Sequence, residues 1–539
     1  MELFVPNFEG ERKRSTRPAM RVLTAGTARA YIHDLLPPRP LSGRPVTPDT
    51  PSILLILSIG YSKMERIYGI FAALAAWFNN STKTASHSAQ LKRALTVQHS
   101  IIPKETIMKK NSVMKFLMGI SIIAWSTFAF ADDQIQSCPI DLQTKADQAY
   151  IEYFPLLENG RAYQAAGMGL AWGKAHPTNT INHNTLLLDH TFDTVVGPNN
   201  DTLYSEWTLD LSAGPVYIEM PYIDPAKRYS SILMLDSMHY EVGVTVNPSG
   251  KIMFVRSGTN YTVPKDVSEV YKFNSDLNMM LHRTEVIDNN DLNEVIALQR
   301  QMKITAPIHR NMDEIYPALD ADFVSRANSL LKGTTLSEAN AKNSDCYKEI
   351  GILSDRKIDK SILDKAVENG QAWMKANESK FETAYFNSEE NAPKKNHQTG
   401  RALANYVWHL AFQPKHADYP NIEFDAEGKR LHGDKVYILT FDKDLPVNAF
   451  WSMTTYILAT KHFVPNEEKL YKVGDKTAVL NPDGKTITIT YSAERPKDST
   501  NWMPTPKGEE FYIGVRMYEA KKEWLDGEYK LPVPVEDQN

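Results

Sequence analysis

The sequence contains few of the motifs that would assign a reaction to it. Its 539 residues include only two cysteines and no Cys-x-x-Cys pair, which excludes the thiol redox motif and its zinc-binding relatives. It also has no Gly-x-x-x-x-Gly-Lys-Ser/Thr loop, no His-Glu-x-x-His helix and no Gly-x-Ser-x-Gly elbow. No local pattern therefore indicates P-loop, zincin or serine-nucleophile chemistry.

Basic charge is scarce in the larger, C-terminal part of the chain. Residues 1–131 hold 17 Lys and Arg against 7 Asp and Glu, whereas residues 132–539 hold 43 against 58 and carry a net charge of −15. Nucleic-acid binding depends on clustered Lys and Arg facing phosphates. We therefore expect no nucleic-acid partner.

Long hydrophobic runs are missing from the first 107 residues. The apolar stretches "SILLILSIGY" and "IYGIFAALAAWF" are shorter than the roughly 20 residues that cross a bilayer. Residues 1–107 also show no sustained hydrophobic period, which is typical of chain that does not fold. We expect this segment to be a spurious or disordered extension; a membrane-tethering leader is the alternative.

The stretch "MKKNSVMKFLMGISIIAWSTFAFADDQ" begins at Met108 and has the three parts of a secretory signal. Basic residues come first, an apolar run spans 116–130, and Ala-Phe-Ala ending at Ala131 provides a small-x-small cleavage site. We expect residues 108–131 to be a signal peptide and the product to begin at Asp132. The product is then periplasmic or secreted, with no stable membrane span after cleavage.

The two cysteines, Cys138 and Cys346, both fall in the exported part of the chain. Disulfides form and persist in oxidising compartments, so a Cys138–Cys346 bond is one expectation. Two free thiols are the other, because the sequence does not give the distance between the two residues.

About 400 residues are too many for one core, and the hydrophobic period divides them into three regions. Residues 132–280 contain short β-rich runs separated by turn dipeptides, after a helix near 143–170 that Pro155 should interrupt. Residues 281–412 have helical spacing, with Asp291 and Glu294 predicted to form a capping box. Residues 413–539 return to strands, such as "TITITYSAE" after the turn "NPDG".

Long ordered motifs in both β-rich regions resemble a known family. "VVGPNNDTLYSEWTLDLSAGP" and "DLNEVIALQ" are similar to exported bacterial proteins with domain of unknown function 1254, and "LPVNAFWSMTTY" with "NWMPTPKGEEFYIGVRMY" is similar to its C-terminal companion, domain of unknown function 1214. The resemblance implies a mainly β protein with a helical layer, built from two tandem antiparallel, jelly-roll-like β-sandwich domains. It supplies no catalytic mechanism, and residues 1–107 depart from the family pattern.

Three weaker patterns do not predict a cofactor or metal site. "GMGLAWG" has one residue too many for a dinucleotide fingerprint and no strand before it. "DNNDLNEVIALQ" lacks the central glycine and the final glutamate of a calcium loop. His176, His183 and His190 recur every seven residues, but the proline and asparagines between them disfavour one helix that would align the rings.

Polar residues around "PNNDTLY" form the first candidate site. As turn formers, Asn199 and its neighbours can bond their own backbone and fix the start of a strand without any ligand. The alternative is a cluster in which an accessible Arg228, held by Asp201 or Asp236, presents its remaining donors to an anionic or hydroxylated ligand. The members of this cluster are Asn199, Asp201, Tyr204, Arg228 and Asp236.

A second candidate set combines aromatic faces with hydrogen-bonding groups in the C-terminal region. This combination suits glycans and other amphipathic small molecules, although burial in the core explains the same residues. The set is Trp451, Ser452, Asn501 and Trp502.

Two classes of function follow from these patterns. The first is an envelope protein that binds a ligand or assembles into a homo-oligomer. The second is a hydrolase-type enzyme with acid–base residues Asp201, His239 and Asp236 between the domains. We favour the first class, because no nucleophile lies beside a base in the sequence.

Overall fold

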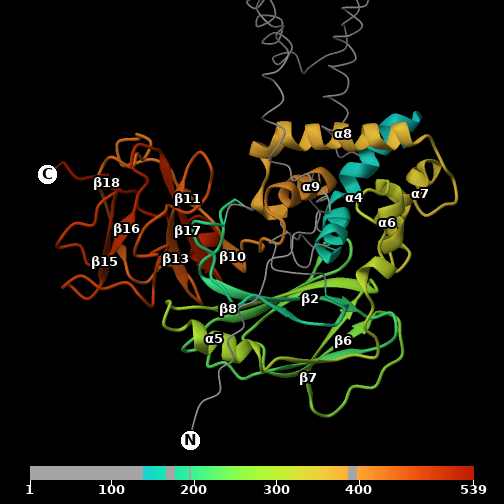
Figure 1. Cartoon of the computed structure of the whole chain (residues 1–539), viewed down its shortest axis with the longest axis horizontal. Coiled ribbons are helices and arrows are strands. Elements are labelled where there is room, and N and C mark those ends of the chain that lie inside the picture. The colour runs from blue at the N-terminus through green and yellow to red at the C-terminus, as the bar shows by residue number, and fades with distance from the viewer. Residues whose placement is uncertain (1–137, 165–175, 193–195, 386–396, 539) are drawn as a thin grey trace, which may run out of the picture. The chain divides into compact units, whose positions relative to one another are not determined.

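A computed structural model describes residues 138–538, apart from 165–175, 193–195 and 386–396 (Figure 1). The predicted signal peptide, its cleavage site at Ala131, residues 1–107 and the "GMGLAWG" motif lie outside the described residues. The described chain is rich in strands, with a large helical portion, and contains two β-sandwiches in tandem. The predicted fold class is therefore confirmed.

The N-terminal sandwich consists of a five-stranded and a four-stranded sheet. The larger sheet has the order β1 (Asn182–His183), β2 (Thr202–Asp210), β8 (Leu277–Glu285), β4 (Ser230–Leu235), β5 (Glu241–Val246). The smaller sheet has the order β7 (Val267–Phe273), β6 (Gly250–Arg256), β3 (Val216–Met220), β9 (Lys303–Thr305). All of these pairs are antiparallel except β6 with β7. Strand β8 runs without interruption across residue 280.

The larger sheet is covered on both faces, which explains why β4 and β8 are buried along their whole length, polar side chains included. In β4, Ile232 and Met234 point into the core between the two sheets, whereas Leu233 and Leu235 point into a second core shared with the helices. This sheet is thus the middle layer between the smaller sheet and the helices (Figure 1).

The helical layer packs on the second face of that sheet. Its helices are α4 (Leu142–Gln164), α6 (Phe323–Leu331), α7 (Glu338–Tyr347), α8 (Lys360–Asn377) and α9 (His397–Val407). Short 3₁₀ turns lie at Met312–Glu314, Lys348–Ile350, Glu378–Lys380 and Thr383–Tyr385. A disulfide between Cys138 and Cys346, with Cα atoms 5.5 Å apart, joins the chain before α4 to α7.

Helix α4 continues through Pro155, contrary to the prediction that this proline interrupts it. A proline inside a helix removes one backbone hydrogen bond and crowds the preceding turn. Buried residues on either side of Pro155, among them Tyr153 and Leu157, pack into the core between the helices and the sheet. This burial outweighs the local cost, because tertiary packing supplies most of the stability of a helix in a protein.

The predicted helix after Asp291 is present as α5 (Leu292–Gln299), but the predicted capping box is absent. Asp291 occupies the N-cap position without a side-chain bond to the helix. Its carboxylate instead binds the Arg228 guanidinium and accepts a hydrogen bond from the Ile287 amide. Glu294 lies 3.5 Å from Arg228. Both acidic side chains therefore face Arg228 and not the backbone N–H groups at the start of α5. A carboxylate forms a stronger hydrogen bond with a charged guanidinium than with a neutral amide.

The C-terminal sandwich also has two sheets. The first has the order β10 (Ala417–Asp418), β17 (Phe511–Tyr518), β13 (Trp451–Ile457), β14 (Val473–Gly474), with β11 (Asn421–Ile422) also paired to β17. The second has the order β16 (Trp502–Pro504), β15 (Thr486–Ser492), β12 (Tyr437–Asp442), β18 (Val535–Glu536). A short helix, α10 (Lys522–Leu525), follows β17.

Two local predictions for this sandwich are confirmed. In β15, Ile487 and Ile489 are buried in the core while Thr488 lies on the opposite face and contacts Thr440 at 2.9 Å. The "NPDG" turn before β15 is closed by a hydrogen bond of 2.9 Å from the Gly484 amide to the Asn481 carbonyl.

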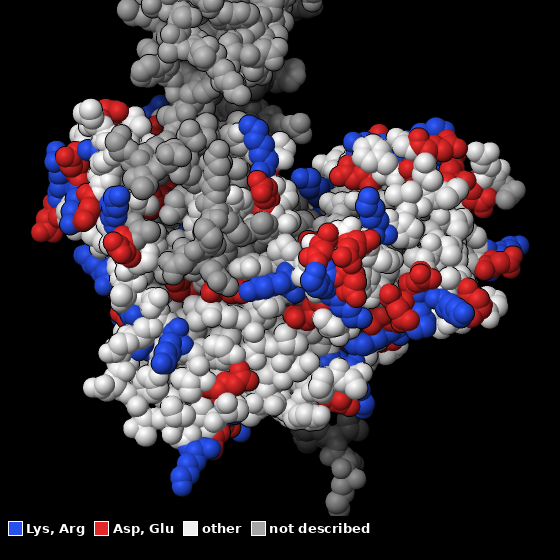
Figure 2. Space-filling view, turned by 180° about the vertical axis from the view of Figure 1, so that it is seen from behind, with Lys and Arg blue, Asp and Glu red and all other residues white. Residues whose placement is uncertain are grey.

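Charges of both signs are mixed over the surface. On the face shown in Figure 2, the described Lys and Arg side chains alternate with Asp and Glu, and they form no broad basic area. Within the described ranges, no helix is both long enough and apolar enough to cross a bilayer.

Candidate functional site

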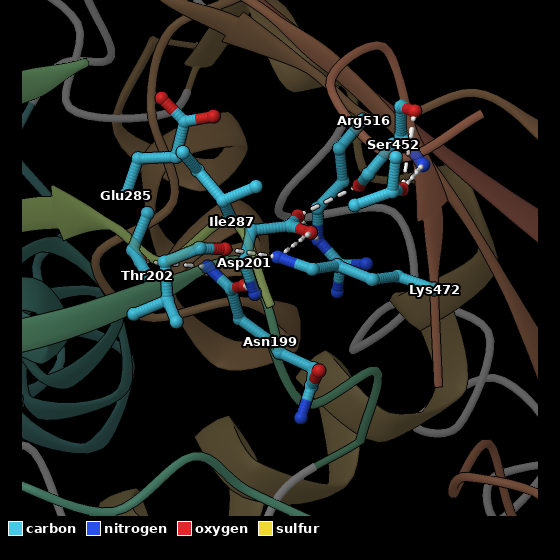
Figure 3. A network of polar contacts seen from close by, with 12 residues as sticks. Asn199, Asp201, Thr202, Glu285, Ile287, Ser452, Lys472 and Arg516 are labelled. Atoms are coloured by element: carbon cyan, nitrogen blue, oxygen red, sulfur yellow. Dashed lines mark hydrogen bonds and ion pairs between the residues drawn. The ribbon is translucent and has the colours of Figure 1, made fainter. Parts of the chain in front are cut away.

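The two sandwiches meet at a buried carboxylate, Asp201, which directly precedes β2. Its Oδ2 accepts a hydrogen bond of 2.7 Å from the Ser452 hydroxyl on β13 and lies 3.8 Å from Arg516 Nε on β17. Its Oδ1 lies 3.7 Å from Lys472 Nζ. Figure 3 shows Asp201 between these three side chains. A charge of the N-terminal sandwich is thus neutralised by groups of the C-terminal sandwich.

Burial acts on the lysine of this network. It lowers the pKa of Lys472, and the negative charges of Asp201 and Glu285 act in the opposite direction. The ammonium group also donates to the backbone carbonyl of Val286. Lys472, which belongs to the C-terminal sandwich, is therefore held by groups of the N-terminal sandwich, even though burial disfavours its charge.

Asn199 fixes the turn that carries Asp201. Its side-chain oxygen accepts a hydrogen bond of 2.5 Å from the Asp201 amide, as in an Asx turn. Its amide nitrogen donates to the hydroxyls of Tyr204, at 2.8 Å, and Tyr518, at 3.2 Å. The predicted structural role of this turn is supported, and the same side chain also lines a cavity.

This cavity, of about 430 Å³, lies beside the Asp201 network. Its wall combines the turn at 196–199, strands β2 and β8, the start of the loop after α9, and strands β13 and β17. Most of the wall is aromatic or aliphatic. The aromatic side chains are Tyr204, Tyr406, Trp408, Tyr419, Tyr456 and Tyr512, and two buried arginines, Arg283 and Arg516, interrupt them.

Arg283 lies on β8, directly opposite Tyr204 on β2. Its guanidinium carbon is 3.9 Å from the centre of the Phe412 ring and 5.6 Å from that of Tyr204. Nη2 donates to the carbonyl of Leu410 at 2.9 Å, whereas Nη1 is buried and has no hydrogen-bond partner among the residues that the structure describes. Within the same residues, Arg283 forms no ion pair with a carboxylate. It is thus a buried cation without a counter-charge in the part of the chain that the structure describes.

The carbonyl that holds Arg283 comes from a strained residue. Leu410 has a φ of 67°, in the left-handed region that a leucine rarely adopts. This conformation costs roughly 1–2 kcal/mol. Residues held in this way are frequent at ligand sites, where the surrounding structure imposes the strain.

Arg516 extends from β17 toward the turn at 196–199. Its Nη2 donates to the carbonyls of Gly197 and Pro198, each at 3.0 Å, and to the Tyr456 hydroxyl at 2.6 Å. Nη1 is buried without a hydrogen-bond partner in the described part of the chain. Burial acts against its charge, but Tyr456 and Asp201 outweigh burial and raise the pKa of Arg516 above its usual value.

His409 adds a neutral imidazole to the cavity wall. Burial lowers its pKa to about 3, with Arg161 contributing in the same direction. Its Nδ1 is 2.6 Å from the side-chain oxygen of Asn405, and its ring stacks on His239 with centroids 4.8 Å apart. Because that oxygen can only accept, Nδ1 carries the proton and Nε2 is an acceptor. Nε2 has no partner among the described residues.

Arg228 is not part of this cavity, and the expected partners Asp201 and Asp236 were wrong. Its side chain is 4% exposed and forms two hydrogen bonds, of 2.5 and 2.6 Å, with the carboxylate of Asp291, which begins α5. It also donates to the carbonyl of Glu285 at 2.6 Å. The structure therefore shows a buried clamp between a strand and a helix, not an accessible ligand contact.

Asp236 belongs to a different network. Its carboxylate accepts a hydrogen bond from the Tyr240 amide at 2.9 Å, and its carbonyl accepts one from Asn159 on α4 at 3.2 Å. His239 has its Nδ1 2.6 Å from the side-chain oxygen of the same asparagine. These two candidate acid–base residues thus fix the helical layer to the sheet, while Asp201 binds Ser452.

Three of the aromatic and amide candidates have structural roles. Trp451 is buried in the core of the C-terminal sandwich against Phe441. Trp502 donates to the Ser492 carbonyl at 3.1 Å, and the side-chain amide of Asn501 donates to the carbonyls of Val479 and Thr488. The Ser452 hydroxyl donates a hydrogen bond to the carboxylate of Asp201 and so joins the two sandwiches. Of the nine predicted ligand contacts, only Asn199 and Tyr204 line the cavity.

The evenly spaced histidines do not form a site together. His183 has its Nδ1 2.8 Å from the Ser205 hydroxyl, and His190 has its Nδ1 2.6 Å from the Tyr471 hydroxyl. Among the described residues, no group of three or more His, Cys, Asp or Glu side chains could hold a metal ion.

Sequence reasoning missed the two arginines that give the cavity its charge. Each is a single basic residue inside a strand whose other members are buried, "LNMMLHRTE" for Arg283 and "FYIGVRMY" for Arg516. A lone arginine in such a run is a usable signal, because Arg is seldom fully buried unless it is paired.

Comparison with family models identifies the two β regions. The model described as Protein of unknown function (DUF1254) matches residues 178–306, and the model described as Protein of unknown function (DUF1214) matches residues 416–522. The chain therefore carries these two domains in the order that the sequence motifs predicted. No curated protein matches it.

Two solved structures are similar to the chain. The VPA0106 protein from Vibrio parahaemolyticus has 23% sequence identity and a TM-score of 0.60 over 74% of this chain and 100% of that protein. This likeness shows a shared fold. An uncharacterized protein from Burkholderia cenocepacia has 15% identity and a TM-score of 0.34 over 76% of this chain and 91% of that protein.

Proposed function

We propose that this chain is an exported envelope protein that binds a small molecule in the cavity between its helical layer and its two sandwiches. The observation that carries the proposal is the composition of the cavity wall. In it, aromatic rings surround two buried guanidinium groups, each with a nitrogen that has no hydrogen-bond partner among the described residues. Ligand sites combine an apolar wall with a few polar groups that fix the orientation of the ligand.

The size of the cavity supports this proposal. Its volume of about 430 Å³ lies within the roughly 300–1,000 Å³ of small-molecule sites. The networks around it are satisfied mainly by backbone and side-chain contacts that hold the wall in position, such as those of Asn199 and Arg516. A preformed wall reduces the ordering cost of binding.

Export is supported by the signal sequence predicted for residues 108–131 and by the disulfide between Cys138 and Cys346. Such bonds are rare in reducing compartments. We expect the native protein recovered from the periplasm or the medium to begin at Asp132, which N-terminal analysis checks. Peptides from residues 1–107 in that species would contradict the proposal.

Binding is tested with a matched pair of variants. Val196 lines the cavity and is 38% exposed, whereas Val263 is 46% exposed and does not line it. We expect a thermal-shift screen of aromatic acids, amides, alcohols and monosaccharides to find compounds that stabilise the wild type and Val263→Trp. The same compounds should stabilise Val196→Trp much less, because the indole fills the mouth of the cavity.

Two outcomes would contradict the proposed function. In one, no compound of the screen stabilises the wild type. In the other, Val196→Trp binds as well as Val263→Trp, which would place the ligand elsewhere.

A further inference from the structure

We propose that the cavity selects a small carboxylate with an apolar body, and that Arg283 binds the carboxylate group. This inference rests on the proposed function, because it names the ligand of the same cavity. It goes further by assigning the charge of the ligand and the residue that recognises it.

The charges around the cavity favour an anionic ligand. Asp201 is shared between Arg516 and Lys472, and Glu285, which also acts on Lys472, is paired with Lys476, so two carboxylates face three cations. Arg283 has no carboxylate partner among the described residues. A buried cation without a partner is costly, and an anion that enters the cavity removes this cost. A neutral sugar or alcohol does not.

The contacts of Arg283 leave one edge of its guanidinium group for a ligand. The Phe412 ring lies 3.9 Å from the guanidinium carbon, and the Tyr204 ring lies 5.6 Å from it. Nη2 is occupied by the Leu410 carbonyl, and Nη1 has no partner in the described part of the chain. The free donor therefore lies at the edge of a planar group whose surroundings are aromatic. A planar carboxylate matches the edge of a guanidinium.

The number of free donors favours a carboxylate over a phosphate or sulfate. Each arginine has one buried nitrogen without a hydrogen-bond partner in the described part of the chain, Nη1 in both cases. Most of the neighbouring wall is aromatic or aliphatic, and its few polar members include a carboxylate, Glu158. A phosphate would bring more oxygens than these donors can satisfy, and a buried oxygen without a partner costs free energy. A carboxylate on an apolar body leaves fewer polar atoms to satisfy and more apolar surface to bury.

Arg161 provides an internal control. It also lines the cavity, but its Nε binds Glu158 at 2.8 Å, so its charge is already matched. Arg161→Gln and Arg283→Gln change the net charge of the protein by the same amount. Only Arg283→Gln removes a cation that lacks a partner.

The experiment measures binding of phenylacetate and hexanoate, and of the neutral amides phenylacetamide and hexanamide, by calorimetry. We expect the wild type to bind at least one acid about tenfold or more tightly than its amide, which corresponds to about 1.4 kcal/mol. Arg283→Gln should lose this preference while its affinity for the amide stays within about twofold. Arg161→Gln should keep the preference.

Four other outcomes are possible, and each would overturn the assigned ligand, the role of Arg283 or the site itself. If acid and amide bind equally to the wild type, the carboxylate assignment fails while the proposed ligand site stands. If Arg161→Gln loses the preference as Arg283→Gln does, the effect is one of overall charge and Arg283 has no special role. If neither acids nor amides bind while an alcohol or monosaccharide of the screen does, the inference fails and the proposed function stands; if no compound of the screen binds, both fail.

Discussion

Arg228 and Asp291 face each other as two parallel forks, joined by hydrogen bonds of 2.5 and 2.6 Å where the chain before β4 meets the start of α5. Arg283 is equally buried but has no such partner among the described residues. This difference in pairing indicates that the two arginines have different roles. Arg228 stabilises the fold, and we infer that Arg283 binds a ligand.

Replacing the paired arginine should therefore weaken the fold. We expect Arg228→Lys to lower the free energy of unfolding by up to about 3–5 kcal/mol, because lysine keeps the charge but cannot form both bonds to Asp291. Urea unfolding measures this change. Arg495→Lys, in the exposed pair with Glu468, is the control and should change stability by less than about 1 kcal/mol. Equal effects of the two substitutions would refute the clamp.

Replacing the unpaired arginine should have the opposite consequence in the ligand-free protein. Arg283→Met removes a buried charge while keeping a side chain of similar length that can pack on Phe412. The lost ring contact is worth roughly 0.5–2 kcal/mol, whereas burial of an uncompensated cation costs several kcal/mol. We expect the melting temperature without ligand to stay unchanged or rise. A clear decrease would show that Arg283 stabilises the fold through contacts that outweigh its charge.

Glu206 on β2 gives the protein a pH dependence with a defined sign. Burial raises the pKa of its carboxyl from 4.5 to about 7, although a hydrogen bond from Asn182 acts in the opposite direction. The folded state therefore binds this proton more tightly than the unfolded state. The resulting stability is fully present below about pH 4.5 and is lost as the pH rises through about 7.

In the variant Glu206→Gln the side chain at position 206 is neutral at every pH, so this variant should not lose stability as the pH rises through about 7. We expect it to resemble the wild type in stability near pH 4 and to exceed it near pH 8 by up to about 3 kcal/mol, from 1.36 kcal/mol for each pKa unit. Chemical unfolding at the two pH values measures the difference. A difference that does not grow with pH would show that Glu206 is already ionised without cost.

The disulfide should contribute through the unfolded chain. It closes a loop between residues separated by 208 positions, and cross-links of this kind typically contribute about 2–4 kcal/mol. We expect Cys138→Ser with Cys346→Ser to lower the free energy of unfolding by that amount under oxidising conditions. Under reducing conditions the variant and the wild type should unfold alike. A stability difference that persists in reductant would indicate that packing, not the bond, is responsible.

The sequence predicted those strands whose formation depends on neighbouring residues in the chain. Strands β2 and β15 were predicted from alternating or β-branched residues and flanking turn formers, and both are present. The path of α4 through Pro155 depends on packing against the sheet and other helices, which no local pattern contains.

The candidate site was harder to predict because its partners are distant in sequence. Arg228 binds a carboxylate 63 positions away, beyond the two aspartates that seemed suitable. Arg516 reaches carbonyls of the turn at 196–199, more than 300 positions earlier. Trp451 and Trp502 look like ligand-binding aromatics in the sequence, and only the pairing of the sheets shows that they face the interior.

The Asp201 network has a further consequence for how the molecule unfolds. Its carboxylate comes from one sandwich, and its hydroxyl, ammonium and guanidinium partners come from the other. Separating the sandwiches would leave all of these charges without their partners at once. The free-energy cost of separating the two sandwiches is therefore close to that of unfolding them completely. The two domains should therefore melt in a single calorimetric transition, and neither should persist as an independent module when the chain is cut between them.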